Sequence, residues 1–185
     1  TQNYERILIV RLDRVGDVLL STPAIRSLRE AFPKSHLAFM VRPYARDIVD
    51  GNPYLDEVIP YDKPRGLAAN LRFVHSLKRK KFDLAVILHP TLRTHLVTFL
   101  AAIPERVGYD AKGGWLLTKR IPHCKQYGLK HEIDYTLDVL RYLGIEPSRR
   151  GLFMPVNHES ERRVKRLFAA NGIRKDDLVI ALNPG

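Results

Sequence analysis

A glycine and an aspartate, Gly16 and Asp17, stand at the boundary between a strand pattern and a helical pattern near the start of the chain. The run Arg6–Leu12 is apolar and contains β-branched residues, as buried strands do, and a helical periodicity extends from Val18 to Phe32. A carboxylate in this position is stabilised by the helix macrodipole and suits a general base that takes a proton from a substrate hydroxyl. Taken alone, this spacing more often indicates an aspartate whose side chain only caps the helix.

The motifs of several other site classes are missing from this sequence. Neither GxGxxG nor GxxxxGK[ST] occurs, which excludes the dinucleotide fingerprint and the P-loop. The single cysteine, Cys124, excludes an internal disulfide framework and a cysteine-based zinc site, and it fits a reducing compartment. His123, Cys124 and His131 are too far apart in sequence to form a metal site, so neither a metal nor a cofactor is expected. His89 is expected to be a structural histidine rather than a ligand contact.

Basic side chains are concentrated in the middle third of the chain. The 185 residues carry a formal charge of +11, and residues 61–131 alone hold 14 basic and 4 acidic side chains, a net charge of +10. With 45% hydrophobic and 28% charged residues, the composition is that of a globular protein and excludes a disordered chain. The charge asymmetry predicts an anionic partner: nucleic acid, an acidic membrane surface or a phosphorylated ligand. The run 78–81 is expected to be the solvated end of a helix.

Strand and helix patterns alternate along the chain. This alternation predicts an α/β fold: a Rossmann-like, mostly parallel sheet with helices on both faces. Residues 109–130 are expected to be irregular. Ligands of such sheets bind at the carboxyl ends of the strands. The predicted strands are Arg6–Leu12, His36–Val41, Glu57–Tyr61, Phe82–Leu88 and Glu105–Gly108, and the predicted helices are Val18–Phe32, Pro43–Asp50, Leu67–Lys80, Leu92–Ala102, His131–Leu143 and Glu159–Asn171.

Five basic side chains lie at or just beyond predicted strand ends, where the topology brings them to one rim. They are Arg11, Arg14, Lys63, Arg65 and Arg93. Arginine guanidinium groups match the geometry of phosphate and carboxylate oxygens. Each of these side chains singly is compatible with a plain surface residue, whereas the charge excess of the middle third favours ligand binding by the group.

The last residues predict that a second domain begins within the chain. Leu178–Leu182 is typical of a buried strand, and it runs directly into Asn183, Pro184 and Gly185. A buried strand needs neighbours, so we expect a first domain over 1–175 and the start of a second over 176–185, the remainder being absent. Neither a signal-peptide pattern nor an apolar run of about 20 residues occurs. A cytoplasmic location is therefore expected, compatible with association at the inner face of the cytoplasmic membrane.

Several segments, taken in order, resemble glycosyltransferase family 9, the heptosyltransferases. The resemblance rests on ILIVRLDRVGDVLLSTPAIRSLREAFP, YLDEVIPYD, FDLAVILHPTLRTHL, RVGY, a helix that begins with HE, and ALNPG. It implies a GT-B architecture, in which two Rossmann-like domains face each other across a cleft. The N-terminal domain of that family binds the sugar acceptor and the C-terminal domain binds the nucleotide-sugar donor, typically ADP-heptose. The chain in hand corresponds to the acceptor half.

The resemblance also implies roles for individual residues. The catalytic base of the family falls on Asp17. Acceptor contacts are expected at Arg11, Arg14, Gly16, Lys63, Arg65, Arg93 and His131, and donor contacts at Asn183, Pro184 and Gly185. The sequence departs from the family at Asp13 and Arg14, where several members have small hydroxyl residues, and at Tyr135, where many have arginine.

The function implied is inverting transfer of heptose from ADP-heptose to the lipopolysaccharide inner core. The partners are then the nucleotide sugar, a phosphorylated lipid A/Kdo acceptor and the inner-membrane surface, and the isolated half is expected to be inactive because it lacks the donor site. One alternative is a non-catalytic basic module that binds nucleic acid or anionic lipid, although no nucleic-acid motif such as RNP1 is present. Another is a different GT-B sugar-nucleotide enzyme such as an epimerase.

Overall fold

The chain divides into two compact units, Thr1–Pro155 and Val156–Gly185. A computed structural model describes residues 3–147 and 149–182. The boundary between the units falls after Pro155, earlier than the expected end of the first domain at residue 175. The assignment of an acceptor part and a donor part to the chain stays a prediction.

A six-stranded sheet in the order β3-β2-β1-β4-β5-β6 forms the first unit, and every neighbouring pair is parallel. The strands are β1 (Arg6–Val10), β2 (His36–Val41), β3 (Glu57–Pro60), β4 (Leu84–Ile87), β5 (Glu105–Tyr109) and β6 (Lys119–Ile121). The predicted Rossmann-like fold is confirmed, and β1 lies in the middle of the sheet. The expectation of an irregular 109–130 is wrong, because β6 pairs with β5 there.

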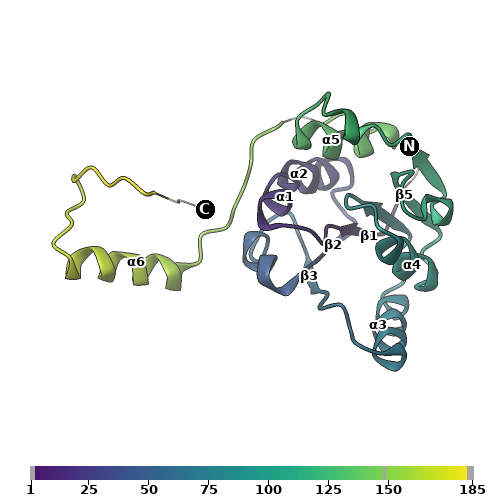
Figure 1. The fold of residues 1–185 in the computed structure, drawn as a ribbon, viewed down its shortest axis with the longest axis horizontal. Helices are drawn as coiled ribbons and strands as arrows, with labels where there is room; N and C mark the ends of the chain where they lie inside the picture. Colours follow the sequence, from purple (N-terminus) through teal and green to yellow (C-terminus); the bar gives the residue numbers. More distant parts are fainter. Residues whose placement is uncertain (1–2, 148, 183–185) are drawn as a thin grey trace. The chain divides into compact units, whose positions relative to one another are not determined.

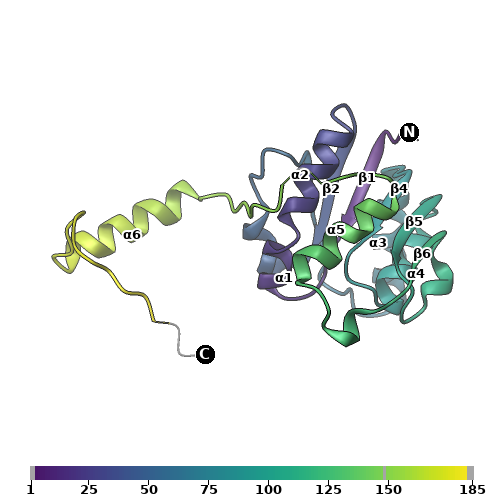
Figure 2. The same cartoon turned by 90° about the horizontal axis from the view of Figure 1, so that it is seen from above.

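Helices cover both faces of the sheet. Figure 1 shows α1, α2 and α5 on one face and α3 and α4 on the other. The α-helices of this unit are α1 (Val15–Leu19), α2 (Thr22–Ala31), α3 (Leu67–Arg79), α4 (Leu92–Leu100) and α5 (Glu132–Tyr142), and the 3-10 helices are η1 (Pro43–Ile48), η2 (Gly114–Leu116) and η3 (Lys125–Tyr127). Figure 2 shows the same layers from above.

Alternate residues of β1 supply the two apolar cores. Ile7 and Ile9 belong to the core beneath α1, α2 and α5, whereas Leu8 and Val10 belong to the core beneath α3 and α4. This alternation is the two-residue period of a strand buried on both faces. It fixes the carboxyl end of β1 in the middle of the sheet.

Two helices differ from their predicted form. The pattern 18–32 forms two helices, because the chain breaks after α1 and Pro23 then occupies the first turn of α2, where its missing N–H costs nothing. The spacing of Leu67, Leu71, Val74 and Leu77 predicts one apolar stripe on α3, but of these only Leu77 is fully buried, while Leu67 is 76% exposed and Leu71 is 52% exposed. The N-terminal half of α3 therefore presents apolar side chains to solvent.

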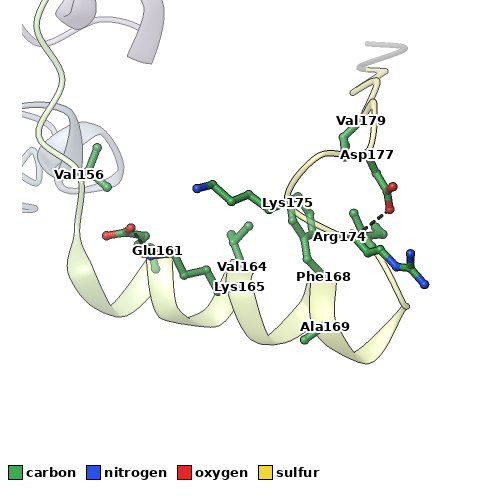
Figure 3. Close-up of a pocket in the computed structure, with 12 residues that line it drawn as sticks. Val156, Glu161, Val164, Lys165, Phe168, Ala169, Arg174, Lys175, Asp177 and Val179 are labelled. Carbon is green, nitrogen blue, oxygen red and sulfur yellow. Dashed lines mark hydrogen bonds and ion pairs between the residues drawn. The ribbon is translucent and has the colours of Figure 1, made fainter.

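The second unit consists of α6 (His158–Ala170) and an extended segment. Asn157 caps α6 by accepting hydrogen bonds from the backbone of Glu159 and Ser160. The expected strand Leu178–Leu182 is not formed, because among the described residues no strand pairs with it; Asn183, Pro184 and Gly185 lie outside those residues. A hollow of about 740 Å³ separates α6 from the extended segment and is lined by apolar side chains such as Val164, Phe168 and Val179 (Figure 3).

No helix in the described ranges is long and apolar enough to cross a lipid bilayer.

Gly108 provides a test of the sheet register. It lies opposite Ile87, and a Cβ at this position would stand 2.8 Å from the carbonyl oxygen of Ile87. We expect Gly108→Ala to lower the free energy of unfolding by about 1–3 kcal/mol in urea denaturation, because backbone must shift to admit the methyl group. Gly16→Ala is the control, since a Cβ there meets nothing within 4 Å. Equal stability of the two variants would contradict the packing of β4 against β5.

Candidate functional site

A polar cavity of about 270 Å³ opens where the central strands end. It lies at the carboxyl ends of β1, β4 and β5, the edge of a parallel sheet where ligands bind. Its lining consists mostly of charged and ring side chains: Arg11, Asp13, Asp17, Leu88, His89, Pro90, Ala111, Lys112, His123, Lys125 and Glu132. The predicted base Asp17 therefore faces a concavity at the rim of the sheet.

Arg11 is the centre of this cluster and is only 2% exposed. Its Nε donates a hydrogen bond to Asp13 Oδ1 at 2.7 Å, and its Nη1 donates to the carbonyl oxygen of Leu88 at 3.1 Å. Its Nη2 donates to Glu132 Oε1 at 3.0 Å and forms an ion pair with Asp17 Oδ1 at 3.3 Å. One buried guanidinium thus contacts carboxylates from three different positions of the chain.

Asp17 is placed by the first turn of α1. Arg14 occupies the N-cap position and makes no side-chain capping bond, and Val18 N donates to the Arg14 carbonyl oxygen. The capping explanation of Asp17 is therefore wrong. Its side chain is 31% exposed and its contact within the described residues is the ion pair with Arg11. A carboxylate that is oriented by a buried cation and reaches an open cavity has the arrangement of a general base.

Glu132 reaches the cluster from the first turn of α5. Lys125 Nζ contacts Glu132 Oε1 at 2.7 Å and stands 5.1 Å from the ring centroid of Tyr109. Burial acts to raise the pKa of Glu132, but the hydrogen bonds from Lys125 and Arg11 outweigh it, and the pKa lies below its ordinary value. Glu132 therefore stays ionised at neutral pH and holds Arg11 and Lys125 together.

Two further groups of the cavity have altered proton affinities. Burial raises the pKa of Asp13 above its ordinary value, against the attraction of Arg11. Burial also lowers the pKa of His89, against the attraction of Asp13. His89 Nδ1 is buried without a hydrogen-bond partner among the described residues. A neutral imidazole with an unused ring nitrogen thus lines the cavity, where the sequence predicted a structural histidine.

Apart from Arg11 and Asp17, none of the predicted site residues that the structure describes lines this cavity. Arg14 and Gly16 are exposed on α1 beside Asp17, and no atom lies within 4 Å of a Cβ built on Gly16, so a ligand has room to approach the backbone. His131 caps α5 by accepting a hydrogen bond from Ile133 N at 3.3 Å. Three predicted contacts are exposed but do not line the cavity: Lys63, Arg65 and Arg93.

Sequence reasoning missed Glu132 and Lys125 as members of the cluster. Both are separated from Arg11 by more than a hundred residues: Glu132 reaches it from α5, and Lys125 of η3 joins the cluster by pairing with Glu132. The sequence feature that could have indicated Glu132 was its position directly after His131, where a helix was predicted to begin. No group of three or more His, Cys, Asp or Glu side chains in the described ranges is arranged to hold a metal ion.

Comparisons with known proteins confirm the resemblance to heptosyltransferases. No protein-family model matches the chain. A glycosyl transferase family 9 protein from Veillonella parvula matches with a TM-score of 0.82 at 25% identity, over 98% of this chain and 55% of that one. Lipopolysaccharide heptosyltransferase 2 of Escherichia coli is 29% identical over 107 residues, which is 56% of this chain and 31% of the relative.

The chain also matches the fold of solved heptosyltransferases. The E. coli heptosyltransferase WaaC, solved with ADP-2-deoxy-2-fluoro heptose, matches with a TM-score of 0.65 at 20% identity, over 78% of this chain and 50% of that one. The six-stranded parallel sheet therefore has the Rossmann-like fold of the GT-B-type structures it matches. The matched part spans 31% of the length of the first of these heptosyltransferases and 50% of the second.

Removal of the Arg11 guanidinium should destabilise the first unit. We expect Arg11→Met to lower the free energy of unfolding by about 3–5 kcal/mol, because three carboxylates lose the buried cation between them. Arg46→Met is the matched control: its ion pair with Asp50 is exposed and contributes about 0.2–1 kcal/mol at most. Chemical denaturation of both variants measures the difference, and similar losses would show that Arg11 does not organise the cluster.

The depressed pKa of His89 predicts that stability falls as the solution is acidified. Below the ordinary histidine pKa of 6.5 the unfolded chain binds a proton at His89 that the folded chain does not. Stability is therefore complete above that pH and decreases below it, by at most about 1.4 kcal/mol per pH unit for this group. Denaturation midpoints at about pH 7.5 and about pH 6 should differ less in His89→Gln than in the natural protein. An unchanged difference would exclude His89 as the cause.

Proposed function

We propose that this chain, which is similar to heptosyltransferases, is the acceptor-binding part of an inverting glycosyltransferase that transfers heptose from ADP-heptose to the lipopolysaccharide inner core. The observation that carries the proposal is the position of Asp17. Its carboxylate lies on the rim of the cavity, in the first turn of α1, and pairs with the buried guanidinium of Arg11. The chemistry of a glycosyl transfer needs one such oriented base next to an open site.

In the proposed reaction the Asp17 carboxylate accepts the proton of an acceptor hydroxyl. The acceptor oxygen attacks the anomeric carbon of the heptose, a new carbon–oxygen bond forms, and the bond to the diphosphate breaks. The electron pair of the broken bond leaves with ADP, and the configuration at the anomeric carbon inverts. Arg11 orients Asp17 from below the cavity, so the base keeps its direction while substrates exchange.

The acceptor is proposed to be a phosphorylated, Kdo-bearing lipid A saccharide. Its phosphates and carboxylates match basic side chains whose charge is not neutralised within the described residues. Arg14 stands beside Asp17 on α1, and Lys63 and Arg65 follow β3, whose carboxyl end lies at the same edge of the sheet. Arginine forks bind such oxygens in pairs and give the acceptor its orientation.

The donor is proposed to bind in a further domain that begins at residue 176, within the second unit. The apolar side chains around the hollow of α6 include Val164 and Phe168, and Leu178, Ile180 and Leu182 of the extended segment are 72–88% exposed. Side chains of this kind normally pack into a core. Solved WaaC holds an ADP-heptose analogue and is about twice as long as the part this chain matches. We therefore assign 176–185 to the first strand and turn of the donor domain.

Replacement of Asp17 tests the proposed reaction in the complete protein. We expect Asp17→Ala to reduce kcat by about 10²–10⁴, the usual effect of removing a general base, with acceptor binding retained. Heptose transfer from ADP-heptose measures the rate. Asp13→Asn is the matched control, because Asp13 contacts the same guanidinium but its carboxylate points to Arg11 Nε. A larger loss of kcat in Asp13→Asn would move the base from Asp17 to Asp13.

Charge reversal tests the proposed acceptor contacts. We expect Lys63→Glu with Arg65→Glu to weaken binding of a phosphorylated Kdo saccharide far more than Arg162→Glu with Arg163→Glu, an exposed pair on α6 with the same charge. Binding should also weaken with added salt, because screening shortens to about 8 Å at physiological ionic strength. Calorimetric titration at two salt concentrations measures both effects. Equal losses in the two variants would leave only a diffuse basic surface.

Lys80 is unsuitable as a neutral reference in this experiment. The sequence predicted that the run 78–81 is solvated, but Lys80 Nζ pairs with Glu57 and its backbone oxygen accepts a hydrogen bond from Arg6. Its reversal would disturb the edge of the sheet as well as the surface charge.

A further inference from the structure

The helices on one face of the sheet carry almost exclusively positive charge. Between Lys63 and Pro104, which includes α3 and α4, the sequence holds eight Lys and Arg side chains and one acidic side chain, Asp83. The carboxylate of Asp83 is engaged by the backbone N–H groups of Glu5 and Arg6. Lys80, directly after α3, pairs with Glu57, and none of the other seven basic side chains of this stretch forms an ion pair with an acidic side chain in the described ranges.

The same two helices expose large apolar side chains. Leu67 and Leu71 of α3 are 76% and 52% exposed, and Leu92, Leu96 and Phe99 of α4 are 41–54% exposed. The three residues of α4 follow the helical spacing of one face, opposite the buried Thr94, His95 and Val97 of that helix. A monomeric soluble surface rarely gathers this many large apolar side chains without a partner.

Trp115 extends this surface through η2. It is 69% exposed, the most exposed of the aromatic side chains in the first unit. The 3-10 helix η2 packs on α4, and α3 packs on α4 as well. A Cβ built on Gly113 would stand 2.7 Å from Leu92 Cδ1, which shows how closely the loop of η2 approaches α4. We call the exposed side chains of α3, α4 and Trp115 the α3–α4 face.

The opposite helical layer has a different character. Arg26 pairs with Glu30 and Arg29 pairs with Asp56 on α2. On α5, Asp138 pairs with Arg141 and with Lys130. The charges there are mixed and neutralised, as on an ordinary solvated surface. By contrast, Arg72, Lys78, Arg79 and Arg93 of the α3–α4 face form no ion pair with the described acidic side chains.

We propose that the α3–α4 face docks on an anionic lipid bilayer. Its basic side chains attract acidic headgroups, and its leucine, phenylalanine and tryptophan side chains enter the boundary between headgroups and acyl chains. Tryptophan is enriched at that boundary because its ring is apolar and its N–H is polar. By charge alone, nucleic acid could also bind this face. However, α4 has one cation, Arg93, among exposed apolar side chains, and that composition favours lipid over nucleic acid.

This inference does not depend on the proposed transferase reaction. It goes beyond that reaction by naming a surface outside the cavity and the class of lipid that the surface binds. The probe is a vesicle without lipid A, Kdo or nucleotide sugar, so a failure of vesicle binding and a failure of sugar transfer are separate results.

Trp115 is the single tryptophan of the chain and reports insertion directly. The full chain is titrated with vesicles of phosphatidylglycerol and phosphatidylcholine in equal amounts, and with vesicles of phosphatidylcholine alone. We expect the Trp115 emission to shift to shorter wavelength with the anionic vesicles, and brominated lipid to quench it. The affinity should fall as salt is added.

Two matched pairs of variants locate the surface. Leu71→Glu should weaken binding on the order of tenfold, whereas Tyr142→Glu on α5, at nearly the same exposure, should not change it. Lys78→Ala with Arg79→Ala should weaken binding roughly 30-fold, because each basic group near the membrane contributes about fivefold. Arg162→Ala with Arg163→Ala removes the same charge from α6 and should have little effect. Circular dichroism confirms that each variant is folded.

Three results would overturn the proposal. The first is an unshifted Trp115 emission with anionic vesicles, and the second is equal weakening by the variants of each matched pair. The third is tight, salt-dependent binding of random-sequence DNA without vesicle binding, which would assign the α3–α4 face to nucleic acid. Concentration-dependent dimers in sedimentation, suppressed by Leu71→Glu, would assign it instead to a second copy of the chain.

Discussion

The buried guanidinium of Arg11 sets the geometry on which the candidate site depends. A cation removed from water loses several kcal/mol of hydration, and only close carboxylates and carbonyl oxygens offset this loss. Here the carboxylates come from the loop after β1, from the first turn of α1 and from the first turn of α5. These segments must therefore converge at the carboxyl end of β1, and their convergence encloses the cavity. The same constraint fixes Asp17, the proposed base, at the rim of that cavity.

The first unit has two surfaces that differ in how their charges are paired, the cavity and the α3–α4 face. At the cavity, acidic and basic groups are paired and largely buried, and the pairing controls which groups are ionised. Glu132 is held in its charged form by Lys125 and Arg11, while burial keeps His89 neutral at ordinary pH. On the α3–α4 face the basic groups stay unpaired next to exposed apolar side chains. The two proposals fit together for a lipid-linked acceptor: we propose that the face docks on the bilayer and that the rim receives the polar part of the acceptor.

The local elements were predictable because each depends on a few neighbouring residues. The apolar run of β1 and the periodicity of the following helix together placed Asp17 at a sheet rim, and the alternation of elements gave the parallel sheet. The break between α1 and α2 was visible only as Pro23.

Other features could not be predicted from the sequence. The strand β6 has three residues, two of them basic, and no sequence pattern indicates that it pairs with β5. The contact of Glu132 with Arg11 depends on tertiary packing across more than a hundred residues, which no spacing along the chain encodes, and Lys125 joins the cluster through Glu132. The strand expected at 178–182 has no neighbouring strand in the part of the chain that the structure describes, and such a strand requires neighbours.

A structure of the complete protein with an unreactive ADP-heptose analogue and a phosphorylated Kdo acceptor tests the central claim most directly. The measured quantity is the distance between the acceptor hydroxyl oxygen that faces the anomeric carbon and the Asp17 carboxylate. The account predicts about 2.6–3.2 Å, the reach of a hydrogen bond to a general base. A hydroxyl oxygen in contact with Asp13 or Glu132 instead, or an acceptor bound away from the cavity, would contradict the role assigned to Asp17.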